Sequence, residues 1–152
     1  MPAGPDRFYS LIDTHLGDDP AVLVINSALP GFSGKGQFPW HLRVIVQCRL
    51  QGDNGMPTTE EMKILRSLEE TIEPALEAQG NAIFLARITS RGERVFLYRV
   101  HDPEEANDTL QRLMSTPEPI REWEYHMEYD LEWDFAKPEL DLVTESAGLD
   151  AG

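Results

Sequence analysis

Residues 122–135 read EWEYHMEYDLEWDF, an unbroken alternation of polar or acidic side chains with apolar ones. Because successive side chains of a β-strand point to opposite faces, this stretch predicts one long strand with an apolar face and an acidic face. Like charges on one face repel each other. We therefore expect a basic neighbouring strand, solvent or a basic partner to balance this acidic face.

The segments before this stretch predict a strand, a helix and a two-stranded hairpin, in that order. Trp40–Leu50 alternates in the same way, and residues 82–101 predict a hairpin that turns at Ser90–Glu93. Between them, Thr58 starts a helix that we expect to end near Gln79. Thr58 is predicted to cap the free amides while Glu61, three residues later, reaches back to the start of the helix.

A second helix is predicted over residues 103–114, with Asp102 as its N-cap. The order from Trp40 is thus strand, helix, strand, strand, helix, strand. This order predicts an α+β, ferredoxin-like two-layer sandwich (βαββαβ), in which the last strand pairs with the first. Residues 7–28 predict an extra N-terminal β-hairpin.

These elements define the expected domain organisation. We predict a single α+β domain over residues 7–135, with the N-terminal hairpin at 7–28 and the ferredoxin-like core at 40–135. Residues 1–6 are expected to be a frayed end. Residues 136–152 show no packing pattern and are expected to be an acidic, flexible tail.

The charge of the chain narrows its possible partners. The formal net charge is −14, from 27 acidic residues against 13 lysines and arginines. A chain this acidic repels phosphate backbones, which argues against direct nucleic-acid binding and favours a basic protein partner. No apolar run is long enough to span a membrane. The single cysteine, Cys48, is expected to be a buried thiol in a reducing compartment, so we predict a cytoplasmic protein.

The segments described so far also resemble a known bacterial family, the domain-of-unknown-function family 695, over residues 8–135. The motifs that carry the resemblance are Phe38-Pro39-Trp40, residues 53–61 (DNGMPTTEE), residues 89–94 (TSRGER) and Phe96-Leu97-Tyr98. The resemblance implies a fold similar to that of the protein regulator B of ribonuclease E activity. By fold-level analogy it also implies a regulatory, non-enzymatic role.

The acidic face of the last strand is the first candidate site. If this strand pairs with Trp40–Leu50, Arg43 and Arg49 share its outer face and offset part of its charge. The remaining carboxylates would form a surface for a basic protein partner, such as a nuclease or a toxin-like protein. The predicted partner-binding residues are Glu124, Glu128, Asp130, Glu132 and Asp134.

A metal site is the alternative. His41 and His101 could approach each other across the sheet, with acidic side chains nearby, and together bind a divalent ion. No HxH or HExxH motif supports this reading, and no nucleophile elbow or phosphate-binding loop is present. We therefore expect a regulatory or interaction protein without a cofactor. A metal-dependent hydrolase is the alternative function.

Overall fold

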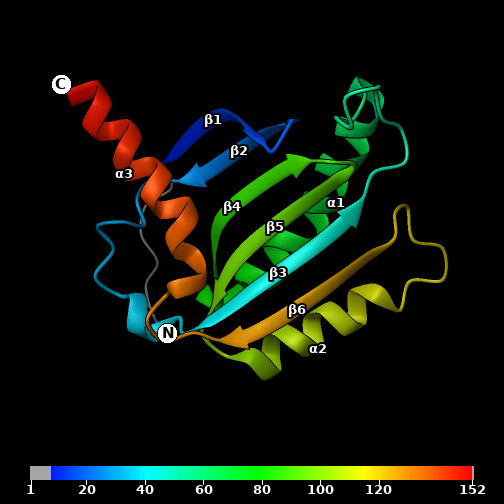
Figure 1. The fold of residues 1–152 in the computed structure, drawn as a ribbon. Coiled ribbons are helices and arrows are strands. Elements are labelled where there is room, and N and C mark those ends of the chain that lie inside the picture. Colours follow the sequence, from blue (N-terminus) through cyan, green and yellow to red (C-terminus); the bar gives the residue numbers. More distant parts are fainter. Residues whose placement is uncertain (1–7, 152) are drawn as a thin grey trace.

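Within residues 8–151, which the computed structural model describes, six antiparallel strands form one sheet and three α-helices pack on it (Figure 1). The strands are β1 (Tyr9–Leu16), β2 (Asp19–Asn26), β3 (Trp40–Gln47), β4 (Ala82–Ser90), β5 (Glu93–Val100) and β6 (Trp123–Tyr129). The α-helices are α1 (Thr59–Glu77), α2 (Pro103–Met114) and α3 (Lys137–Ala151). Short 3-10 helices lie at η1 (Lys35–Gln37), η2 (Ala78–Gly80) and η3 (Asp134–Ala136).

The strands lie in the order β1-β2-β4-β5-β3-β6, so β1 and β6 are the two edges of the sheet. The α+β class is confirmed, as are the β4–β5 hairpin and the antiparallel pairing of β6 with β3. The N-terminal strands also form a hairpin, with Leu16 opposite Asp19 and Gly17 in a left-handed turn conformation (φ +65°). This hairpin extends the sheet, because β2 pairs with β4. The predicted frayed end at residues 1–6, and Arg7, lie outside the described residues.

Helices α1 and α2 cover one face of the sheet and bury the larger of two apolar clusters. Leu65, Ile72 and Leu76 of α1 pack with Leu110 of α2 against the strand side chains that point to this face. Thr58 caps α1 as predicted, since its Oγ1 accepts a hydrogen bond from the Glu61 amide at 3.2 Å. The Glu61 carboxylate does not reach back to the helix start, so that expectation is wrong. It is buried and paired with Arg121.

The opposite face is covered by α3, at the place where we expected a flexible tail. Leu140 and Val143 of α3 and Ala136 of η3 are buried against Ile25 of β2 and other apolar residues of this face. This segment has few apolar residues, and they pack on strands that lie far away in the sequence. The tail expectation is therefore corrected for residues 137–145, which form a packed part of the fold (Figure 1).

Strand β6 is also shorter than predicted, because it ends at Tyr129 and not at Phe135. Trp133 adopts a left-handed conformation (φ 60°), which turns its ring into the apolar cluster beneath α3. The alternation from Asp130 to Phe135 therefore does not continue the strand. It continues through a turn and into η3. There the turn, and not a sheet face, decides which side chains are buried.

Candidate functional site

The outer face of β6 keeps part of the predicted acidic surface. Glu124 and Glu128 are exposed and lie opposite Ile45 and His41 of β3. Arg43 lies opposite His126, between the two glutamates, so its predicted place on this face is confirmed. His126 Nε2 lies 3.3 Å from Glu124 Oε2.

Arg49 lies beyond the end of β3 and has no cross-strand partner on β6, contrary to our expectation. Its backbone amide donates a hydrogen bond to the buried Glu61 carboxylate at 2.8 Å. Arg43 is therefore the one predicted arginine that lies beside the acidic residues of β6. The charge of Glu124 and Glu128 is less balanced by β3 than the sequence suggested.

The remaining three predicted partner-binding residues lie beyond the strand. Asp130 is buried, with a side-chain exposure of 5%, and is paired with Arg99 of β5, so it is not available to a partner. Glu132 and Asp134 are exposed, but they lie in the turn and in η3, off the sheet face. Asp130 is therefore not part of the proposed surface. Glu132 and Asp134 lie, at most, beside that surface.

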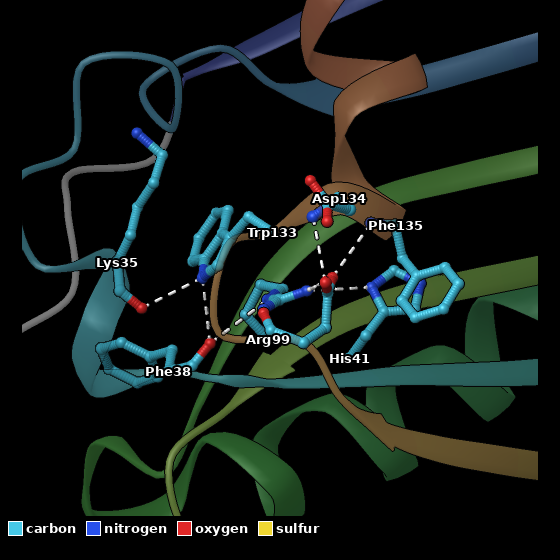
Figure 2. Close-up of polar contacts among 8 residues, drawn as sticks. Lys35, Phe38, His41, Arg99, Trp133, Asp134 and Phe135 are labelled. Atoms are coloured by element: carbon cyan, nitrogen blue, oxygen red, sulfur yellow. Dashed lines mark hydrogen bonds and ion pairs between the residues drawn. The ribbon is translucent and has the colours of Figure 1, made fainter.

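Asp130 and Arg99 are the centre of a buried polar network at one end of the sheet (Figure 2). Arg99 Nη1 donates to Asp130 Oδ2 at 2.9 Å, and Arg99 Nη2 donates to the Asp130 carbonyl oxygen at 2.6 Å. Arg99 Nε donates to the Phe38 carbonyl oxygen at 3.2 Å. The Asp130 carboxylate also accepts the backbone amides of Asp134 and Phe135, each at 3.0 Å.

Trp133 packs on the Arg99 side of this network. The Arg99 guanidinium lies 4.4 Å from the centre of the indole ring, within the range of a cation–π interaction. The indole Nε1 donates to the carbonyl oxygens of Lys35 and Phe38, at 3.0 and 3.1 Å. The network thus ties β5, the end of β6, η3 and the η1 segment together. With the charges of Arg99 and Asp130 paired, it stabilises the fold.

His41 belongs to the same network, which fixes its protonation state. Arg99 Nη1 lies 3.3 Å from His41 Nδ1, and because a guanidinium only donates, Nδ1 must accept and the ring proton must sit on Nε2. Burial, aided by the positive charge of Arg99, lowers the pKa of His41 to about 4. His41 is therefore neutral at pH 7, and its ring packs against Phe135 at 5.6 Å between centroids.

His101 is not brought into a shared site with His41. Its Nδ1 bonds to the Gln37 carbonyl oxygen at 2.6 Å, and its ring packs against Phe38. Within residues 8–151 no group of three or more His, Cys, Asp or Glu side chains is placed to hold a metal ion. Cys48 is a buried free thiol whose pKa is raised, first by burial and then by the charge of Glu61. A thiol of this kind is a poor nucleophile.

A groove of ≈ 440 Å³ lies on the outer sheet face between β6 and α3. We call it the outer groove. Its apolar lining is Ile45, Ile88, Val95, Leu97 and Phe135, and its polar lining is His41, Arg43, Glu93, His126, Glu128 and Glu139. Helix α3 packs on residues of β2, β4 and β5, and the outer groove lies beside it over β3, β5 and β6.

Glu139 of α3 is the functional candidate that the sequence reasoning missed. Its Oε2 is buried and has no hydrogen-bond partner among the described residues. Burial raises the pKa of this carboxyl. A buried oxygen without a partner costs free energy, so it indicates a place where a donor can bind. Its only signal in the sequence was its position in the first turn of a helix that we did not predict.

The comparisons with known proteins identify a family and no activity. The model of a family described as "Family of unknown function (DUF695)" matches residues 9–136 of the chain. No curated protein and no solved structure matches it. In the described part of the chain, no helix is both long and apolar enough to cross a membrane.

Proposed function

Because the chain belongs to the family of unknown function DUF695, which brings no activity with it, we propose its function from the geometry of the outer sheet face. The proposed function is that of a non-catalytic interaction domain that binds a basic protein partner. The lone, buried thiol of Cys48 is consistent with action in the cytoplasm.

The observation that carries the proposal is the chemistry of the outer groove. The carboxylates of Glu93, Glu128 and Glu139 line a groove whose floor is apolar. A lysine or arginine side chain has the same division, with an apolar stem and a cationic head. Such a side chain would cover Ile45 and Val95 with its stem and give the unpaired Glu139 oxygen a donor.

The charge around the groove favours this ligand over an anionic one. Arg43 and the partly exposed His126 are the basic groups in its lining, against three carboxylates. The whole chain carries a net charge of −14, which attracts a basic protein from a distance and speeds its association. A nuclease or a toxin-like protein with a basic surface fits this description.

The strand order supports a related proposal about the fold. From the order β4-β5-β3-β6, with α1 and α2 on one face, we propose a ferredoxin-like arrangement, to which the β1–β2 hairpin adds two strands. A fold similar to that of the regulator B of ribonuclease E activity would agree with a regulatory role, by analogy alone.

Two other readings compete with this proposal. Charged side chains on an edge strand also prevent edge-to-edge aggregation, which would explain Glu124 and Glu128 without a partner. A metal-dependent hydrolase has no comparable support, because His41 and His101 are engaged separately, with Arg99 and with the Gln37 carbonyl.

The test compares two variants with the same change of charge. Glu128→Lys reverses a carboxylate of the outer groove, and Asp108→Lys reverses an exposed carboxylate on α2, on the other side of the sheet. The immobilised full chain and both variants are exposed to native lysate at low and high salt. Captured proteins are then purified and their binding to each variant is measured.

We expect a basic protein that binds the wild type and Asp108→Lys but not Glu128→Lys, and that is released by salt. Glu139→Gln should weaken the same complex, because it removes the carboxylate that receives the cation. If Glu128→Lys and Asp108→Lys bind every captured protein equally, the outer groove is not a binding site. The acidic residues of β6 then serve only to protect the edge.

A further inference from the structure

We propose that the opposite face of the sheet holds a second, independent site, which binds a small amphiphilic anion between Arg66 and Arg94 and along the apolar wall of the N-terminal hairpin. The ligand class is a molecule with one carboxylate or phosphate head and an apolar body. This site does not depend on the proposed partner binding.

The site arises because the sheet is wider than the helices that cover it. Strands β1 and β2 extend the sheet beyond α1, so within residues 8–151 no helix covers the helix-side face of the hairpin (Figure 1). Cross-strand partners share a face. The pairs Leu11↔Val24, Val24↔Arg87 and Thr89↔Arg94 therefore place apolar and basic side chains in neighbouring rows on this face.

A cavity of ≈ 320 Å³ lies over these rows, and we call it the hairpin cavity. Met62, Arg66 and Glu69 of α1 form one wall, and Met56 and Pro57 of the preceding loop close one end. Cavities of roughly 300–1,000 Å³ are of the size that holds small molecules. The hairpin cavity is at the lower end of that range, which favours a compact or a slender ligand.

Three arginines line the hairpin cavity, and in the described part of the chain only Arg87 forms an ion pair with a carboxylate. Arg87 Nη1 is paired with Glu69 Oε1 at 2.8 Å. Arg94 is 8% exposed, and its Nε donates to the Thr89 hydroxyl at 3.0 Å. Among residues 8–151 no carboxylate forms an ion pair with Arg94 or with the exposed Arg66.

Arginines without a carboxylate ion-pair partner are unusual in a chain with so many acidic residues. Burial, together with the neighbouring charge of Arg87, lowers the pKa of Arg94, although the charge of the nearby Glu69 carboxylate opposes this, so the protein keeps this cation at a cost. A buried charge is normally paired, because removing it from water is expensive. An anionic head placed between Arg94 and Arg66 would supply the missing partner through charge-assisted hydrogen bonds.

The rest of the hairpin cavity argues for an apolar body on that anion. Leu11 is 68% exposed and Met62 is 44% exposed, and both line the cavity together with Val22 and Val24. Large apolar side chains this exposed next to a cavity indicate a surface that a ligand covers. An inorganic anion would leave them uncovered, and a neutral apolar molecule would leave Arg94 unpaired.

The test uses four probes on the full chain: decanoate, decyl phosphate, decanol and acetate. Binding is measured by calorimetry, and the site is located by NMR shifts of the Leu11, Val22, Val24 and Met62 methyl groups. Arg66→Ala removes the exposed arginine of the cavity. Arg112→Ala is the matched control, because it removes an exposed arginine of α2 that does not line the hairpin cavity.

We expect saturable binding of decanoate or decyl phosphate that shifts the hairpin methyl groups, and the tighter of the two identifies the head group. Losing one charge-assisted contact should weaken binding about tenfold in Arg66→Ala and leave binding by Arg112→Ala unchanged. Acetate should bind much more weakly than decanoate. If decanol binds as well as decanoate, if no anion saturates the hairpin signals, or if both variants behave alike, the proposal is wrong.

Discussion

Replacing Asp130 with asparagine should cost about 3–5 kcal/mol of unfolding free energy, the range for breaking one side of a buried ion pair. The substitution keeps the size of the side chain but removes its charge. Arg99, whose side chain is 0% exposed, would then be a buried cation without a counter-charge. The pairing also depresses the pKa of Asp130, although burial opposes this, so the stabilisation is present above its ordinary pKa of 3.8.

The hydrogen bonds explain why asparagine cannot substitute for the carboxylate. Oδ1 accepts the Asp134 amide, and Oδ2 accepts both the Phe135 amide and Arg99 Nη1. Every side-chain contact of Asp130 is therefore with a donor. In either orientation, the NH₂ group of an asparagine would face at least one backbone N–H, and that contact would be lost.

The assay is urea unfolding followed by the fluorescence of the three tryptophans, one of which, Trp133, packs on Arg99. With a slope of about 2 kcal/mol per molar urea, the midpoint should fall by roughly 2 M. Glu124→Gln is the matched control: it removes an exposed carboxylate from β6 and should change stability by less than about 0.5 kcal/mol.

A double variant separates the charge effect from the loss of hydrogen bonds to η3. Arg99→Met combined with Asp130→Asn removes the uncompensated cation but restores no bond to Asp134 or Phe135. It should be more stable than Asp130→Asn alone by at least about 1 kcal/mol. A loss below about 1 kcal/mol for Asp130→Asn, or no recovery in the double variant, would refute the reasoning.

Three further predictions concern single groups. The depressed pKa of His41, about 4 against an ordinary 6.5, means that the unfolded chain binds the extra proton, so stability should fall by about 3 kcal/mol as pH drops through this window. His41→Gln should flatten that part of the stability–pH curve. The pKa of Glu139 is raised, so the stability that its protonated carboxyl contributes is lost as pH rises above the ordinary glutamate pKa of 4.5. Glu139→Gln should remove this loss of stability. An unchanged stability–pH curve would contradict the prediction. Thr58→Ala should cost about 1 kcal/mol in the same urea assay, because it removes the cap of α1, with Thr144→Ala near the chain end as a milder comparison.

Local patterns were sufficient to predict most of the strands and helices. The alternation in Trp40–Gln47 and the capping residues Thr58 and Asp102 act over a few residues, so they can be read without the rest of the chain. Pairing of β6 with β3 followed from the order of these elements. The predictions that depended on distant contacts were weaker, as the end of β6 shows.

The alternation misled us after Tyr129 because two different structures satisfy the same pattern. In β6, every second side chain is half-buried because the strand lies on α2. From Asp130 onward, Trp133 is buried because the chain turns into the cluster beneath α3, and Leu131 is 46% exposed where a strand would bury it. Similarly, Leu140 and Val143 pack on β2, more than 100 residues earlier, and no local signal identifies that partner. Pro138, in the first turn, was the one local sign of a helix start.

The candidate site was predicted only in part, because a sequence does not show which charges are buried. Asp130 counted as a surface carboxylate, but its partner Arg99 lies 31 residues away in β5. Arg121 and Glu61 are a second buried pair, 60 residues apart. Each pair removes one acid and one base from the surface together. Since the chain has 27 acids and only 13 bases, every such pair raises the ratio of acids to bases among the groups that remain outside. Burying arginines therefore makes the surface more acidic than the composition implies, which favours a basic partner at the outer groove even though the acidic strand is shorter than its sequence suggests.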